Sequence, residues 1–218
     1  MKRKILKIAS DKCGLDEELL DIVDTKIIEK GIKRELYTLE EIALEAYYNK
    51  EKYAPITSDL TVKVKNNAIV YGATFVEVEV DIRTGKIKIL NIYNIHDSGK
   101  ILNRKLAEGQ VHGGVSMALG FALSEKFIID EKTGAIINNN LLHYKIPTIM
   151  DTPKINCEFV NTYDPTSSYG QKSLGESTTI SPAPAIRNAV LNATGVAFNK
   201  LPMDSQTVFK KFKEVGLI

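Results

Sequence analysis

One carboxylate stands in a segment of small, uncharged residues near the end of the chain. Residues 170–187 read GQKSLGESTTISPAPAIR, and Glu176 directly follows Gly175. A glycine leaves open space beside the acid, and apolar burial raises a carboxylate pKa toward the range of a general base at neutral pH. Lys172 would either oppose that rise or hold the loop through hydrogen bonds. Glu176 is therefore a candidate base, and the alternative is that its charge caps the helix expected at 181–194.

A second candidate is the amide of Gln110, within the segment EGQVHGGVSMALG at 108–120. Glycine inside a helix costs about 1 kcal/mol relative to alanine, so Gly109, Gly113 and Gly120 indicate close approach by a backbone or a ligand. Gln110 lies about one turn from Gly113, and its amide offers donors and acceptors to a heterocycle or phosphate. The alternative is a helix packing contact, with Gln110 capping a neighbouring loop.

Other chemistries find little support in the sequence. No GxGxxG or GxxxxGK[ST] phosphate loop occurs. GVSMA offers Ser116 as a serine nucleophile with His143 as its base, but the segment before it is polar and helix-like rather than a buried strand. Cys13 and Cys157 are far apart, which argues for a reduced cytoplasmic chain without its own iron–sulfur or zinc site. A metal would have to arrive with another group.

The composition is typical of a soluble globular protein of one large or two small domains. The 218 residues include 29 basic and 27 acidic ones, mixed along the chain, for a net charge of +2. This balance gives no indication of nucleic-acid binding. No segment approaches the roughly 18 to 20 apolar residues of a membrane span.

The elements that must position the candidates follow from local patterns. Helical spacing predicts a helix over 15–31, Thr38 and Glu41 form the pattern of a capping box, and strict alternation predicts a β-hairpin over 75–95 with its turn at Thr84-Gly85. In this hairpin Val76, Val78, Val80, Ile82, Ile87 and Ile89, with Tyr93, would line one face.

Later segments alternate less regularly between the two types of structure. A turn at Ser98-Gly99 precedes a helix that begins near Asn103, and strands are expected at 126–134 and 154–160. Ser181-Pro182 would start a helix that runs to about 194, and 204–216 would form a last short helix. Because strands and helices do not strictly alternate, we expect an α+β fold with a β-hairpin-containing sheet packed against several helices.

Several segments, in this order, resemble one known family. They are the D-x-G-x-x-L-N turn at 97–103, the G-Q-x-x-G-G helix at 109–114, the Y-x-I-P-T segment with D-x-P at 144–153, and K-x-x-G-E at 172–176. The order and spacing are similar to the C-terminal part of the molybdopterin-binding subunit in the xanthine dehydrogenase/aldehyde oxidase family of molybdenum hydroxylases. The resemblance covers residues 36–218, after an N-terminal helical segment at 1–35. Arg104 and His112 depart from the usual family pattern.

The resemblance assigns roles to the candidate residues. It implies that Gln110 contacts the molybdopterin, that Gly175 lies at the cofactor because a side chain would collide with it, and that Glu176 is the base beside molybdenum. The reaction implied is the oxidative hydroxylation of an aromatic heterocycle or aldehyde, with the redox chemistry performed by the cofactor.

The resemblance also implies missing partners. The family's earlier portion, which completes the molybdenum pocket, is absent, as are its flavin (FAD) and iron–sulfur (2Fe–2S) subunits. We therefore expect a subunit part that needs these chains, is inactive alone, and self-associates through the surface that they would cover. The rival hypothesis is a non-catalytic relic or scaffold domain that docks onto another subunit.

Overall fold

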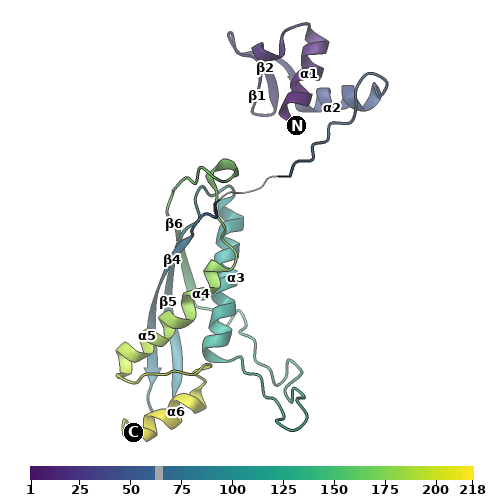
Figure 1. Ribbon diagram of the computed structural model, residues 1–218. Coiled ribbons are helices and arrows are strands. Elements are labelled where there is room, and N and C mark those ends of the chain that lie inside the picture. Colours follow the sequence, from purple (N-terminus) through teal and green to yellow (C-terminus); the bar gives the residue numbers. More distant parts are fainter. Residues whose placement is uncertain (62–65) are drawn as a thin grey trace. The chain divides into compact units, whose positions relative to one another are not determined.

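The computed structural model describes residues 1–61 and 66–218, which belong to two compact units, Met1–Lys63 and Val64–Ile218 (Figure 1). Each unit has its own three-stranded sheet and its own apolar core. The expected α+β class is confirmed, since helices and sheets are mixed without strict alternation. The boundary placed after residue 35 falls inside a strand of the first unit, and the two compact units divide later, at residue 63.

The first unit wraps two helices around a small antiparallel sheet with the order β1-β2-β3. Its core consists of apolar side chains from both helices, from β1 and β2 and from the segment after α2. The elements are α1 (Lys2–Cys13), a 3-10 turn (Glu17–Leu19), β1 (Leu20–Val23), β2 (Lys26–Glu29), β3 (Arg34–Thr38) and α2 (Leu39–Tyr48).

The helix predicted over 15–31 is wrong, because that segment forms the β1–β2 hairpin. Asp24 and Thr25 take φ values of +46° and +68°, and positive φ at both central positions is typical of the two-residue turn that joins tight hairpins. Ile22 then pairs with Ile27 across the two strands. The β-branched residues that suggested a helix stripe fit a pleated sheet better than a helix.

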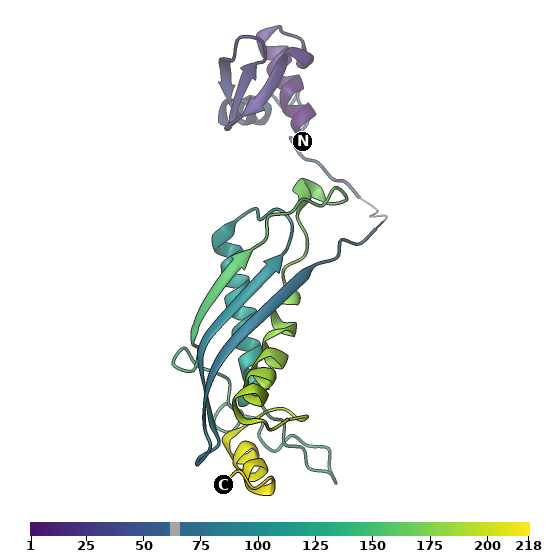
Figure 2. The same ribbon diagram turned by 90° about the vertical axis from the view of Figure 1, so that its left-hand side faces the viewer.

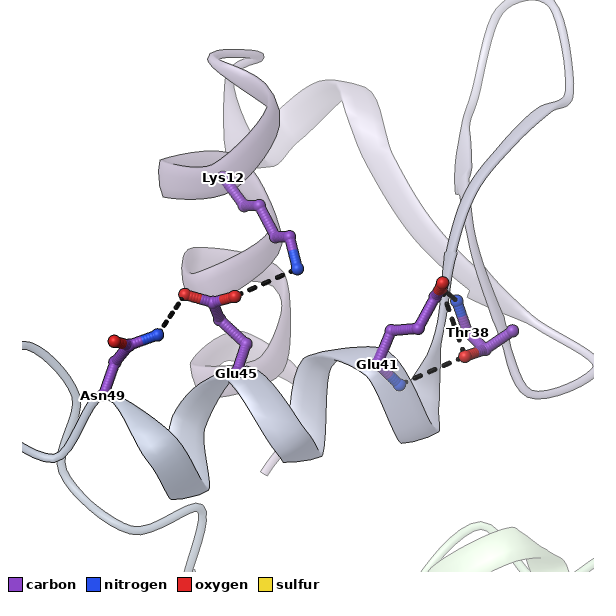
Figure 3. Close-up of polar contacts among 5 residues, drawn as sticks. All are labelled: Lys12, Thr38, Glu41, Glu45 and Asn49. Carbon is purple, nitrogen blue, oxygen red and sulfur yellow. Dashed lines mark hydrogen bonds and ion pairs between the residues drawn. The ribbon is translucent and has the colours of Figure 1, made fainter.

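The predicted capping box at the start of α2 is confirmed. The Thr38 hydroxyl accepts from the Glu41 amide at 3.1 Å, and the Thr38 amide donates to the Glu41 carboxylate at 2.7 Å (Figure 3). One turn further along α2, Glu45 pairs with Lys12 of α1 at 3.0 Å and accepts from Asn49 at 2.6 Å. Of these contacts, the Lys12–Glu45 pair joins α1 to α2, and the others stabilise the two ends of α2.

The second unit places its helices on one face of a sheet with the order β4-β5-β6. Figure 2 shows α3 and α5 behind the same face of the three strands. β4 and β5 are antiparallel, while β5 and β6 are parallel. The elements are β4 (Tyr71–Asp81), β5 (Lys86–Asp97), α3 (Arg104–Leu123), β6 (Lys154–Phe159), a 3-10 turn (Ser168–Gly170), α4 (Ser177–Ile180), α5 (Pro182–Thr194) and α6 (Ser205–Glu214).

The predicted hairpin is confirmed as β4 and β5, with two corrections. Ile82, which we expected on the core face, follows the last residue of β4 and is 40% exposed. The register shifts between Glu77 and Val78, so that Leu90 of β5 is an extra residue between the two ladders. An extra residue inverts the side-chain alternation beyond it. As a result Ile92 is fully buried, whereas Tyr93, which we expected on the core face, is 51% exposed.

Two further expectations need correction. Residues 126–134 form no strand and contribute only an isolated bridge between Ile129 and Ile136. Ser181 does not cap the following helix, because α4 precedes it and gives it helical backbone angles. Its hydroxyl instead bonds to Thr74 of β4 at 2.6 Å, while Pro182 does occupy the first position of α5. The helices expected from about 103 and over 204–216 are confirmed as α3 and α6.

Candidate functional site

The candidate site lies where α3 meets α4 and the loop before α4. Asn103 begins α3, and its side chain accepts from the Leu106 amide at 3.1 Å. The two helices pack against each other (Figure 1). Gly114 permits this contact, because a Cβ there would lie 1.9 Å from the Thr178 hydroxyl and 3.1 Å from the Thr178 carbonyl carbon. Close packing therefore explains this glycine.

Gly109 and Gly113 of the same helix have a different environment. A Cβ at either position would meet no described atom within 4 Å, so packing within the chain does not explain them. Gln110 lies between them on the exposed side of α3. A Cβ on Gly175 would lie 3.7 Å from the Gln110 side-chain nitrogen. The structure thus brings two of the three candidate residues together beside an open glycine-lined surface.

The loop that carries Gly175 is tied to the end of β5. The Lys172 amide donates to the Ser98 carbonyl at 2.8 Å, and the Lys172 ammonium lies 2.9 Å from the Asp97 carboxylate. Hydrogen bonds from the Thr162 hydroxyl, from Lys172 and from the Gly99 amide hold the pKa of Asp97 below its usual value. Of the two roles considered for Lys172, the structure supports the one in which it holds the loop.

Glu176 begins α4 and is exposed. Among the described residues its side chain makes no capping hydrogen bond, so the capping alternative is not realised through the carboxylate. The backbone around it is ordered by two bonds, from the Thr178 hydroxyl to the Gly175 carbonyl at 2.8 Å and from the Thr179 amide to the Glu176 carbonyl at 3.0 Å. The apolar enclosure expected around Glu176 is not supplied by the described part of this chain.

The sequence analysis missed a row of buried polar residues at the end of β5. Asn94 and His96 alternate along the strand, Ser98 follows its last residue, and all three are almost completely buried, with His96 0% exposed. Neither ring nitrogen of His96 has a partner among the described residues, and burial lowers its pKa. A Cβ on Gly72, its cross-strand neighbour, would lie 2.9 Å from the ring. The alternation of these polar residues is visible in the sequence. Which face of the sheet they occupy, however, depends on the bulge at Leu90, which no local pattern predicted.

The described residues contain no group of three or more His, Cys, Asp or Glu side chains arranged to hold a metal ion. None of the described helices is both long enough and apolar enough to span a membrane.

Comparison with known proteins gives consistent matches. Residues 1–153 match the molybdopterin cofactor-binding domain family. The chain is 47% identical over 183 residues to the putative xanthine dehydrogenase molybdenum-binding subunit of Escherichia coli, which covers 84% of this chain and 24% of that subunit. Among solved structures, a Cu,Mo-CO dehydrogenase matches 99% of this chain and 28% of its own, at 26% identity and a TM-score of 0.82.

A third relative is matched over a similar share of both chains. The quinoline 2-oxidoreductase of Pseudomonas putida 86 matches 97% of this chain and 28% of its own, at 25% identity and a TM-score of 0.80. The chain thus spans about a quarter of the length of these relatives. The family match covers more than half of the chain and includes α3 with Gln110. We conclude that the chain belongs to the family of molybdopterin cofactor-binding domains.

Proposed function

We propose that this chain is the C-terminal part of the molybdenum-binding subunit of a molybdenum hydroxylase, with Glu176 as its base. The observation that carries the proposal is the approach of Gln110 to Gly175, since it joins two segments far apart in the sequence at one open surface. The relatives support the class of enzyme, because their names include xanthine dehydrogenase, aldehyde oxidoreductase and carbon monoxide dehydrogenase.

The residues present fit a molybdopterin. The space that a side chain on Gly175 would fill lies beside the Gln110 amide, and the helix surface at Gly109 and Gly113 is equally bare. When bound, the cofactor supplies the oxidative chemistry. In this proposal Gln110 donates to and accepts from polar edges of the pterin. Gly175 lets it approach the backbone, and the Glu176 carboxylate takes a proton during the hydroxylation of an aromatic heterocycle or aldehyde.

The proposed subunit is incomplete without partners. Glu176 is exposed in this chain, and a general base works best in a site from which water is excluded. We propose that the remaining three quarters of a full-length relative supply the other walls of the pocket. Flavin and iron–sulfur subunits would then carry the electrons away, as the sequence resemblance implies.

The test is reconstitution with the Escherichia coli relative. Its molybdenum-binding subunit, without the segment that this chain matches, would be produced together with this chain and the other Escherichia coli subunits. The wild-type chain should restore xanthine oxidation and copurify with molybdenum. Glu176→Gln should lower turnover by a factor of about 100 or more, in line with the loss of a general base, with molybdenum content unchanged. Glu79→Gln, on the exposed face of β4, is the matched control.

Two results would count against this function. Turnover retained in Glu176→Gln would refute the base assignment. A complex that forms without molybdenum, measured by mass spectrometry of the metal, would instead favour the non-catalytic scaffold. Gln110→Ala provides a separate readout, because it should lower the pterin content of the complex even where turnover is not measured.

A further inference from the structure

A long irregular segment leaves the C-terminal end of α3 and projects away from the sheet before the chain returns to β6 (Figure 1). We call residues 126–150 of this segment the arm. Its large apolar side chains are mostly exposed, up to 88% for Ile149 and 89% for Met150. The exposed set comprises Phe127, Ile128, Ile129, Ile136, Ile137, Leu141, Leu142, Ile146, Ile149 and Met150.

Several polar contacts hold the arm in its path. The buried Asn138 side chain accepts from the Ile128 amide at 2.9 Å and donates to the Lys126 carbonyl at 2.6 Å. At the base, the Tyr144 hydroxyl donates to Glu125 at 2.6 Å, just beyond the end of α3. Besides the contact between the Phe127 and Tyr144 rings, whose centroids lie 5.1 Å apart, these internal contacts are polar, while ten large apolar side chains of the arm remain exposed. So many exposed apolar side chains in one segment are unusual for a segment made to lie in water.

The tip of the arm is apolar on both of its faces. Ile129 bridges Ile136, and the Ile137 amide donates to the Ile128 carbonyl at 2.8 Å, so the two sides of the tip are paired in an antiparallel manner. Successive side chains in extended backbone point to opposite faces. The Ile128–Ile137 pair and the Ile129–Ile136 pair therefore lie on different faces. A flat partner would cover only one of them, so the tip fits a partner that encloses it.

The extent of the relatives indicates what that partner is. The likeness to the Cu,Mo-CO dehydrogenase covers 99% of this chain but only 28% of that chain, so the arm there belongs to a polypeptide more than three times as long. A cluster of exposed large apolar side chains, such as the ten of the arm, marks an interaction site. The tip also carries both signs of charge, with Asp130, Glu131 and Lys132 in sequence, which does not favour a nucleic acid or an anionic membrane.

We propose that the arm inserts into the remaining polypeptide of a molybdenum-binding subunit, which buries both of its apolar faces. The inference rests on the proposed function only for the identity of that partner. It adds that assembly depends on a segment that carries none of the candidate site residues.

The test measures copurification of tagged variants with the shortened Escherichia coli subunit described above, in the absence of the other subunits. Ile128→Ser with Ile137→Ser alters one face, and Ile129→Ser with Ile136→Ser alters the other. Each pair should lower the recovered partner at least tenfold. Ile32→Ser, at a still more exposed isoleucine between β2 and β3, should leave the recovery unchanged. Circular dichroism should show all variants folded, because the altered side chains are exposed.

Four outcomes would overturn the proposal. The first is failure of the wild-type chain to recover the partner, and the second is equal recovery by all variants. The third is a loss confined to one pair, which would mean that the tip lies on a flat surface. The fourth is a wild-type dimer that the arm variants abolish and the partner does not displace, seen by light scattering, because the occupant would then be a second copy. Molybdenum content separates the two proposals, since an arm-dependent complex without molybdenum would contradict only the proposed function.

Discussion

The two faces of α3 use glycine in different ways. On the packed face, Gly114 lies against Thr178, between fully buried residues such as Val111, Val115 and Ala118. On the open face, Gly109 and Gly113 have no described neighbour within 4 Å of a Cβ position. Contacts within the described part of the chain therefore explain the glycine on the packed face but not the two glycines on the open face.

In our proposal, this difference marks the part of the chain that the rest of the subunit would cover. A helix-interior glycine costs about 1 kcal/mol relative to alanine. At Gly114 the close approach of α4 offsets that cost, whereas nothing in the described part of the chain offsets it at Gly109 and Gly113. In our proposal, the cofactor and the rest of the subunit pack against the open face and account for these two glycines.

The largest expected effect comes from truncation on the packed face. Leu119→Ala removes a buried side chain from the core of the second unit and should lower the free energy of unfolding by about 2–5 kcal/mol. Met117→Ala, on the open face, should change it by less than about 0.5 kcal/mol. Urea unfolding of both variants measures the two free energies of unfolding. Similar losses at the two positions would contradict the distinction between a packed and an open face of α3.

A smaller loss is expected from adding one methyl group to the packed face. In Gly114→Ala the new Cβ would lie within 2 Å of the Thr178 hydroxyl, so either α4 moves or the packing is strained. Overpacking of this kind costs about 1–3 kcal/mol. Chemical shifts of the α4 amides would report a movement of α4, and urea unfolding would measure the loss of stability. An unchanged α4 with unchanged stability would show that the contact is looser than described.

The buried ring of His96, on β5, should also make the stability of the chain depend on pH. Its folded-state pKa lies below the usual 6.5, so below pH 6.5 the unfolded chain takes up a proton that the folded chain does not. Stability should therefore fall as the pH drops from 6.5, by up to about 1.4 kcal/mol per pH unit. The lowered pKa of Asp97 acts in the same direction but only below its usual 3.8.

Unfolding curves at pH 7.5, 6.5 and 5.5 check this expectation. His96→Leu removes the titrating ring and should flatten the dependence without a large loss at pH 7.5, since the ring has no described partner to leave unpaired. His112→Asn, at an exposed position of α3, is the control. An equally steep dependence in His96→Leu would assign it to other groups.

The smallest effect has the opposite sign. Gly113→Ala should stabilise the isolated chain by about 0.5–1 kcal/mol, because alanine favours the helix and its Cβ meets no described atom. In the reconstituted complex the same change should lower molybdenum content, because the methyl group would occupy space kept for the cofactor. Unfolding and metal analysis together are the test. Stabilisation with undiminished molybdenum would mean that the open face does not serve the cofactor.

Much of the fold was predictable because its signals are local. The capping box at Thr38, the turn at Gly85 and the start of α3 at Asn103 each depend on residues within a few positions of one another. Prediction failed over 15–31, where one apolar pattern suits either a helix or two short strands until tertiary packing selects one. It also failed at Tyr93, because one bulged residue reverses the faces of a strand.

The sequence by itself determined the segments of the candidate site and their order, from the G-Q-x-x-G-G helix to K-x-x-G-E. Only the tertiary structure decided that Gly175 lies beside Gln110, that Lys172 anchors its loop to Asp97 75 positions earlier, and that His96 is buried. It also decided which glycines of α3 are packed and which are open. The physical reason is that such contacts depend on how α3, α4 and the sheet pack against one another, and no short-range pattern encodes that packing.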